Sequence, residues 1–211
     1  MNRNIPYARE LSVALAAVRE GAALTRSVQA EITPAVLEKK DKSPVTVADY
    51  GCQALVCRAL GEAFSDDPIV GEEDSAELRE EANRPLRERL VDAVRRQKDE
   101  LAEADVLAAI DRGGASEHSP RFWTLDPIDG TKGFLRKQQY AISLALVVDG
   151  EIALGLLGCP NLPVDAGASE SGVACWAVRG VGAHREPLAG GEARPIRASD
   201  VRDPHRVRIC E

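Results

Sequence analysis

The chain has 211 residues, of which 44% are hydrophobic and 29% charged, a composition typical of a globular protein with a substantial core. Its formal net charge of −7 argues against a nucleic-acid polymer as the main partner, because such binders need a positive surface. A small phosphorylated substrate remains compatible with this charge, since a bound metal ion neutralises phosphate locally.

Cysteine usage and hydropathy bear on the compartment. The five cysteines are scattered, without a C-x-x-C pair, and their odd number argues against a disulfide framework or a zinc site. This usage favours a reducing compartment, so we expect a cytoplasmic protein. The apolar run over residues 11–18 is too short to span a membrane and is flanked by charged side chains. We therefore expect neither a signal peptide nor a membrane anchor.

The first third of the chain predicts two helices separated by a polar segment. Residues 6–31 carry apolar side chains at helical spacing and predict a long packing helix. Residues 45–47 are β-like after Pro44, and a second helix is predicted to begin at Asp49. Asp49 is interpreted either as an N-cap, which is favoured for the residue taken alone, or as a carboxylate directed into a site. The two interpretations are compatible.

A short buried strand is predicted at residues 69–71, and three acids follow it directly: Glu72, Glu73 and Asp74. A row of acids is usually a solvated surface, but strand ends are also where sheets carry their sites. Residues 75–110 are predicted to be mainly helical, with one helix beginning near Pro85. His118, in the loop that follows, is interpreted as simply exposed.

Residues 122–134 hold the pattern with the clearest chemistry. An apolar strand is predicted to run into residues 126–131, Asp-Pro-Ile-Asp-Gly-Thr, where a short helix begins. Proline and glycine permit a tight bend that would direct Asp126 and Asp129 at one spot. Two ionised carboxylates ~4 Å apart repel by roughly 4 kcal/mol at an effective dielectric near 20, so a proton or a cation is needed between them. Hard oxygen ligands suit Mg²⁺.

The turn itself is predicted to bind an anion. The amides of Gly130 and Thr131 would open the short helix and present N–H groups to a phosphate. The alternative is a solvated Asp-Gly turn, which would be the better interpretation of an isolated motif. Here Trp123 and Phe134 frame the motif, which favours a metal and phosphate site.

The last third of the chain predicts antiparallel strands. Residues 140–148 and 151–158 form a hairpin through Asp149-Gly150, and residues 173–178 form a further strand. Cys159 as a nucleophile is disfavoured, since no histidine lies nearby in the sequence. Residues 184–196 are rich in Gly, Pro and charge and predict a boundary, after which residues 207–210 begin another strand.

Four segments together resemble one family: residues 41–50, 69–74, 123–134 and 158–162. The chain resembles the magnesium-dependent, lithium-sensitive phosphatases of the inositol monophosphatase superfamily, whose D-P-[IL]-D-G-T motif matches residues 126–131. Inositol phosphatases usually continue this motif with x-N-F, whereas Lys132-Gly133 is similar to the branch that acts on bisphosphate nucleotides. The resemblance covers nearly the whole chain. It implies an α+β fold of the layered αβαβα sugar-phosphatase type, with N-terminal helices packed on a mainly antiparallel sheet.

The resemblance also implies individual roles and a cofactor of two or three Mg²⁺ ions. The implied metal ligands are Glu72, Asp126, the Ile128 carbonyl and Asp129. Asp49 and Thr131 match the pair that orients the attacking water, and Glu72 is expected to share in catalysis. The amides of Gly130 and Thr131 match the phosphate cradle. Asp41 and the loop around it match a mobile segment that closes over the site.

One family motif has no counterpart in the sequence. Family members carry a later W-D-x-A segment whose aspartate completes the metal site, but neither Trp123 nor Trp176 precedes an aspartate here. We therefore expect an N-terminal metal- and phosphate-binding domain over residues 1–190. Residues 191–211 would begin a second α/β domain that is largely missing, either through a truncated gene product or because the sequence is a fragment.

Three functions stay open at this point. The first is hydrolysis of the 3′-phosphate of adenosine 3′,5′-bisphosphate to give AMP and phosphate, with 3′-phosphoadenylyl sulfate as a second substrate. The second is an inositol or other sugar-phosphate phosphatase, against which Lys132-Gly133 argues. The third is a catalytically incomplete, metal-binding fragment. In the first, the partner is a small nucleotide, and neither a nucleic-acid polymer nor a membrane is expected.

Overall fold

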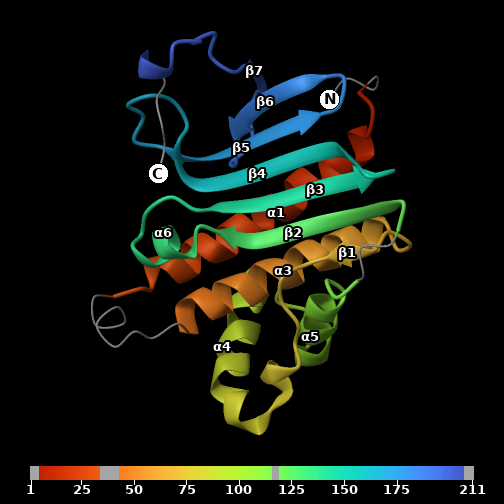
Figure 1. Cartoon of the computed structure of the whole chain (residues 1–211). Coiled ribbons are helices and arrows are strands. Elements are labelled where there is room, and N and C mark those ends of the chain that lie inside the picture. The colour runs from red at the N-terminus through yellow and green to blue at the C-terminus, as the bar shows by residue number, and fades with distance from the viewer. Residues whose placement is uncertain (1–4, 34–42, 116–118, 207–211) are drawn as a thin grey trace.

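A computed structural model describes residues 5–33, 43–115 and 119–206, which form one seven-stranded sheet with helices on one face (Figure 1). The strands lie in the sheet in sequence order. β1 pairs with β2 in parallel, and every later neighbour is antiparallel. The strands are β1 (Ile69–Val70), β2 (Arg121–Asp129), β3 (Ala141–Val148), β4 (Glu151–Pro163), β5 (Ser171–Val178), β6 (Gly182–Pro187) and β7 (Arg194–Ile196).

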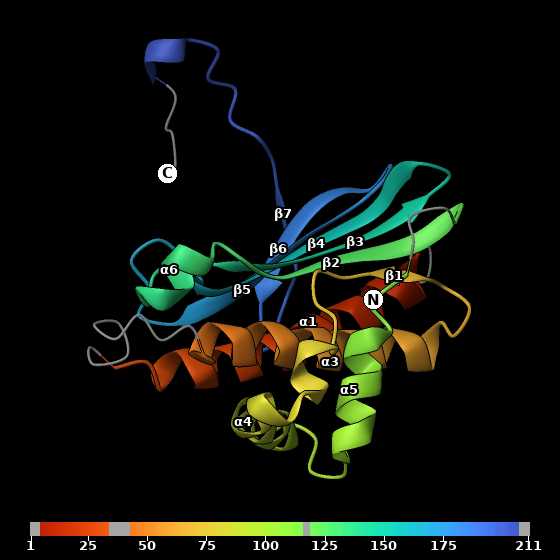
Figure 2. The ribbon, with the colours of Figure 1, turned by 60° about the horizontal axis from the view of Figure 1, so that its bottom comes forward.

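The helices form two layers beneath the sheet, as Figure 2 shows. The inner layer is α1 (Ala8–Ala30) and α3 (Ser43–Ala63), with α1 on β3 and β4 and α3 on β2. The outer layer is α4 (Arg84–Arg95) and α5 (Glu103–Asp111), which pack on α3. The remaining described helical elements are short: η1 (Glu77–Arg79), η2 (Glu81–Asn83), α6 (Thr131–Leu135) and η3 (Pro204–Arg206).

Two buried clusters hold these layers together. The first lies between the sheet and the inner helices and includes Leu11, Trp123 and Leu144. The second lies between α3 and the outer helices and includes Leu90 and Phe134. Both α1 and α3 contribute to the two clusters, and α3 contacts β2 on one side and the two outer helices on the other.

Most predicted elements are confirmed. The long first helix, the short strand at Ile69, the central strand with its following helix, and the helix near Pro85 all form. The hairpin turns at Asp149-Gly150, where both residues have positive φ of 52° and 78°, as a type I′ turn requires. The predicted α+β class, with N-terminal helices on a mainly antiparallel sheet, is confirmed.

The predicted start of the second helix is wrong. Residues 45–47 are helical rather than extended, and α3 begins at Ser43, so Asp49 lies inside the helix and is not its N-cap. Pro44 is tolerated because the first turn of a helix needs no N–H from it. Val45 and Val47 are buried in the second cluster, and this burial outweighs their β propensity.

The predicted boundary at residues 184–196 contains two strands, β6 and β7. The charged residues suggested an exposed linker, but Glu186 is buried and paired with Arg19 of α1. β4 also continues to Pro163, beyond the predicted strand end. The sheet therefore reaches Ile196, whereas the division into domains near residue 190 stays a prediction.

Several expectations fall outside the described residues: the loop around Asp41, the exposure of His118 and the strand at residues 207–210. Among the described helices, none is both long and apolar enough to cross a bilayer. The cysteines within the described ranges are all free thiols.

Candidate metal and phosphate site

The central motif forms a bulge at the end of β2. Asp126 pairs with Ser143 of β3 and Asp129 with Ala141, so residues 127 and 128 lie opposite Ile142 alone. Such a bulge bends the strand and redirects the side chains around it. The Ile128 N–H turns back and donates to Asp126 Oδ1 at 3.1 Å, which fixes this carboxylate.

The chain then turns from strand to helix, as the sequence predicts. Gly130 has φ 95° and immediately precedes α6, a left-handed conformation that glycine adopts without strain. The Thr131 hydroxyl donates to the Ile128 carbonyl oxygen at 3.5 Å. Asp129, Gly130 and Thr131 are all exposed, so this turn is open to a ligand.

Parallel pairing brings the acids after β1 beside this turn. Ile69 lies opposite Trp123 and Val70 opposite Thr124. Extending that register by two residues puts Glu72 level with Asp126. Burial raises the pKa of Asp126, and the negative charges of Glu72 and Asp129 raise it further. These three carboxylates therefore act on one another electrostatically.

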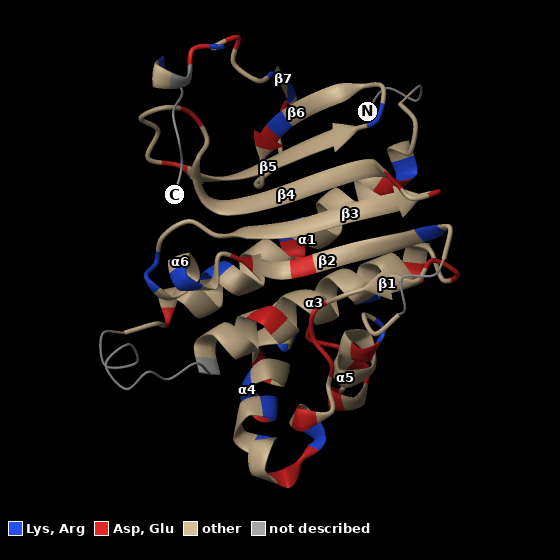
Figure 3. Cartoon of the chain, in the orientation of Figure 1, with Lys and Arg blue, Asp and Glu red and all other residues tan. Residues whose placement is uncertain are grey.

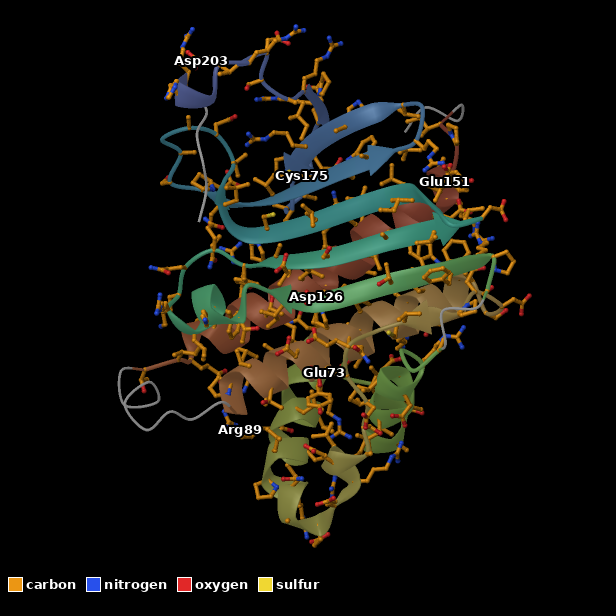
Figure 4. All side chains as sticks on the ribbon, in the orientation of Figure 1. Glu73, Arg89, Asp126, Glu151, Cys175 and Asp203 are labelled. Carbon is orange, nitrogen blue, oxygen red and sulfur yellow. The ribbon has the colours of Figure 1, made fainter. Side chains whose placement is uncertain are left out.

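Asp49 joins the same group from α3. It is half-buried, and its pKa is raised to about 8 by burial together with the charges of Glu73, Glu72 and Asp126. We call Asp49, Glu72, Asp126 and Asp129 the acidic site. Figure 3 shows the acidic loop after β1 running past α3, and Figure 4 marks Asp126 on its strand and Glu73 on that loop. The structure thus brings together four carboxylates predicted from separate segments.

The neighbouring acid Glu73 is turned to a different partner. Its carboxylate accepts a hydrogen bond from Tyr50, which is buried on α3. Burial raises the pKa of Glu73, and the Tyr50 hydrogen bond counteracts this rise. Glu72, by contrast, is exposed beside Asp126. Of the two adjacent glutamates, Glu72 is therefore the one available to a ligand.

The donor set fits a hard divalent cation. Carboxylate oxygens and the Ile128 carbonyl are the ligand types that Mg²⁺ prefers, and the raised pKa of Asp126 reflects carboxylates that a cation would stabilise. In the described residues, no group of three or more Asp, Glu, His or Cys side chains is arranged so that it could hold a metal ion by itself. Mg²⁺ does not require such a group, because it commonly keeps several waters and uses one or two carboxylates together with substrate phosphate.

The segment at residues 158–162 supports the turn from the other side. Asn161 Nδ2 donates to Gln29 Oε1 of α1 at 2.9 Å and to the Gln138 carbonyl at 2.7 Å. Gln139 Nε2 donates to the Asn161 carbonyl at 2.8 Å. These bonds join the end of β4, the first helix and the loop after α6.

Cys159 lies in the same segment. Burial, together with the nearby Cys175 and Asp129, raises the pKa of its thiol to about 11. The thiol is thus protonated near neutral pH, which agrees with the expectation that it is not a nucleophile.

Sequence reasoning missed one polar residue that contacts the acidic site, Gln53. It is fully buried one helical turn after Asp49, and its amide bonds to the backbone of Glu72 and Glu73. A signal was present, because Gln53 is a polar residue between the buried positions Cys52 and Ala54 of an apolar helix. The pattern marks Gln53 as unusual but does not identify its partners.

Comparison with known proteins gives consistent matches along the chain. The model of the inositol monophosphatase family matches residues 7–207. The chain is 38% identical to the 3′(2′),5′-bisphosphate nucleotidase of Emericella nidulans, over 97% of this chain and 66% of that protein. It is 42% identical to the enzyme of the same name from Oryza sativa, over 98% of this chain and 63% of that protein. The chain therefore spans just under two thirds of the length of these curated relatives.

Solved structures match the fold. SuhB of Mycobacterium tuberculosis superposes with a TM-score of 0.54 and 25% identity, over 94% of this chain and 54% of that one.

Proposed function

Because the chain belongs to the inositol monophosphatase family, we propose that its acidic site hydrolyses a phosphate monoester with the help of Mg²⁺. The observation that carries this proposal is the convergence of Asp49 on α3, Glu72 in the segment after β1 and Asp126 on β2. Burial raises the pKa of Asp49, and the charges of Glu72 and Asp126 are among those that add to this rise. Phosphoryl transfer asks mainly for positioning and charge neutralisation, which carboxylates and bound cations supply without a covalent nucleophile.

Four groups would hold the metal: the side chains of Glu72, Asp126 and Asp129, and the carbonyl oxygen of Ile128. When bound, Mg²⁺ ions neutralise phosphate charge and favour formation of the attacking hydroxide. The bulge at residues 127–128 holds Asp126 and the Ile128 carbonyl in a fixed relation, because the Ile128 amide is bonded to the Asp126 carboxylate.

Asp49 and Thr131 orient the attacking water in this proposal. The Thr131 hydroxyl donates its proton to the Ile128 carbonyl, so its oxygen is left as an acceptor for a hydrogen bond from a water. Bound cations would offset the negative charges of Glu72, Glu73 and Asp126 that raise the pKa of Asp49, and the ionised Asp49 carboxylate would then accept the proton that the water loses. The amides of Gly130 and Thr131 bind the phosphate oxygens at the exposed turn.

The proposed substrate is adenosine 3′,5′-bisphosphate, which loses its 3′-phosphate to give AMP; 3′-phosphoadenylyl sulfate is the second candidate. The names of the relatives from Emericella nidulans and Oryza sativa support a bisphosphate nucleotide over an inositol phosphate. The division into a domain over residues 1–190 that carries this site and the start of a second domain over residues 191–211 remains part of this proposal.

Phosphate release tests the proposal. We expect Mg²⁺-dependent release from adenosine 3′,5′-bisphosphate, inhibited by Li⁺, with a higher kcat/KM than for inositol 1-phosphate. Asp126→Asn should abolish release and weaken Mg²⁺ binding measured by calorimetry, while circular dichroism stays unchanged. A panel that ranks inositol phosphate first would instead assign the sugar-phosphate activity. Mg²⁺ binding without turnover of any substrate would make the chain a metal-binding but catalytically incomplete unit.

A further inference from the structure

The side-chain amide of Gln53 forms all the hydrogen bonds it can, three with the segment after β1 and one with α5. Its Oε1 accepts from the N–H groups of Glu72 at 3.2 Å and Glu73 at 3.0 Å. Its Nε2 donates to the carbonyl oxygens of Glu73 at 2.5 Å and Ile110 at 3.0 Å. A side-chain amide offers two donors and two acceptor lone pairs, so every one of them is occupied.

Two glycines leave the room that this amide occupies. A Cβ on Gly71 would lie 2.5 Å from Gln53 Oε1, and a Cβ on Gly113 would lie 2.6 Å from Nε2. The two glycines are also joined by a main-chain hydrogen bond, in which the Gly71 N–H donates to the Gly113 carbonyl at 2.7 Å. The Gln53 amide is therefore enclosed between α3, the end of β1 and the end of α5.

The segment that Gln53 contacts has little other support from the sheet. β1 is only two residues long and ends before the acids. Glu72 and Glu73 are adjacent, so a slip of one residue would exchange the acid that faces Asp126 for the one bonded to Tyr50. A Cβ in the place of Gly71 would lie 2.5 Å from Gln53 Oε1, so the enclosed amide opposes any slip that moves Val70 or Glu72 into that place.

We propose that Gln53 is a positioning residue of the acidic site, which locks the main chain so that Glu72 faces Asp126 and Glu73 faces Tyr50. This role rests on the proposed function, because it assigns Glu72 as a metal ligand. Asp49 and Gln53 are one helical turn apart and lie on the same side of α3. A single helix thus supplies one acid of the site and sets the register of another.

The test removes the amide without removing its volume. Gln53→Met keeps the length of the side chain but leaves the Glu72 and Glu73 amides without their acceptor. Groups that orient metal ligands typically change metal affinity by roughly 10–100-fold, so we expect calorimetry to give at least tenfold weaker Mg²⁺ binding. Hydrogen exchange of the Glu72 and Glu73 amides in metal-free protein should accelerate by a similar factor.

Leu55→Ala is the matched control, because Leu55 is buried on the same helix but packs in the second cluster. It should lower the melting temperature while leaving Mg²⁺ affinity and the two amides as in the parent. Should Gln53→Met fail to fold, Gln53→Asn retains the amide on a side chain one methylene shorter and should give the same changes.

Equal Mg²⁺ affinity and equal amide protection in the Gln53 variants and Leu55→Ala would overturn the positioning role, even if the parent releases phosphate. If the unmutated protein binds Mg²⁺ but releases no phosphate, the proposed function is wrong. The Mg²⁺ affinity and the amide hydrogen exchange of the variants would still decide the role of Gln53.

Discussion

Asp49 combines two environments that oppose ionisation. It is half-buried on α3, and negative charges surround it from the segment after β1 and from Asp126. Its pKa rises from 3.8 to about 8 in the metal-free protein. A group with a raised folded pKa contributes stability that is fully present below its unfolded pKa and is lost as pH rises through its folded pKa. Asp49 therefore destabilises the metal-free fold progressively between about pH 4 and 8.

Asp49→Asn should separate stability from activity. Without Mg²⁺, the variant should melt a few degrees above the parent at pH 8.5 and close to it at pH 4, since about 1 kcal/mol corresponds to roughly 2–4 °C in a chain of this size. Phosphate release should be lost, because the asparagine cannot accept a proton. Thermal melts in EDTA at both pH values measure the first effect. Glu170→Gln, which neutralises an exposed acid, is the control. A gain at pH 4 equal to that at pH 8.5 would contradict the assigned cause.

Gly133 has a structural reason for its place after the motif. A Cβ there would lie 2.0 Å from the Gln139 carbonyl oxygen, so α6 approaches the following loop more closely than any other residue allows. Gly133→Ala should displace α6 and the exposed turn before it. We expect a stability loss of about 1–3 kcal/mol, typical of overpacking, and at least tenfold lower kcat/KM. Urea unfolding and phosphate release measure the two. Gly155→Ala is the control, because its new Cβ would meet only an ordinary contact at 3.9 Å. If Gly133→Ala kept the kcat/KM of the unmutated protein, the position of α6 would not matter for phosphate release.

At the scale of elements, periodicity and turn chemistry predict those structures whose cause is local. The hairpin at Asp149-Gly150 and the strand-to-helix turn at Gly130 depend on backbone conformations that glycine marks in the sequence. The start of α3 could not be predicted in this way, because burial of Val45 and Val47 against other helices decides it. β6 was hidden for a similar reason, since the partner of Glu186 is on α1.

Asn161 joins β4 to α1 and to the loop after α6, and Lys137 Nζ adds a bond between that loop and the Ala30 carbonyl of α1. Asn161 bonds to Gln29 and to the Gln138 carbonyl, and Gln29 Nε2 donates in turn to the Phe134 carbonyl at 2.9 Å. Asn161→Ala leaves these partners unsatisfied, which costs about 1–3 kcal/mol for a buried group. We expect this loss in urea unfolding, together with lower turnover because the end of α6 loosens. Asn83→Ala is the control, since that side chain bonds one exposed carbonyl outside the site. Equal losses in both variants would argue against a special role for Asn161.

Across the whole molecule, the acidic site could be predicted because its members stand in short, recognisable segments. The motif alone places Asp126 and Asp129 in one site, and the family resemblance adds Glu72 to it. What it could not supply is the support around them, because Gln53 reaches its partners only once α3, β1 and α5 have packed. The hydrophobic pattern of a sequence does not reveal which main-chain atoms a buried side-chain amide will bond, because every residue offers the same main-chain groups.

Figure 2 shows α1, α3 and the outer helices on one side of the sheet. On the sheet, apolar side chains of β3, β4 and β5 line a shallow hollow. Ile152 is 60% exposed and Leu157 42%, beside a hollow of about 330 Å³ that Trp176 and Ile196 also line. Exposed contiguous apolar surface binds amphiphilic dyes. The native chain should therefore enhance the fluorescence of anilinonaphthalene sulfonate, and Ile152→Lys combined with Leu157→Lys should reduce that signal by at least half. Val201→Lys, which charges an exposed apolar residue outside the hollow, should leave the signal unchanged. Equal fluorescence in the double variant and the parent, with both folded by circular dichroism, would show that the dye binds elsewhere on the chain.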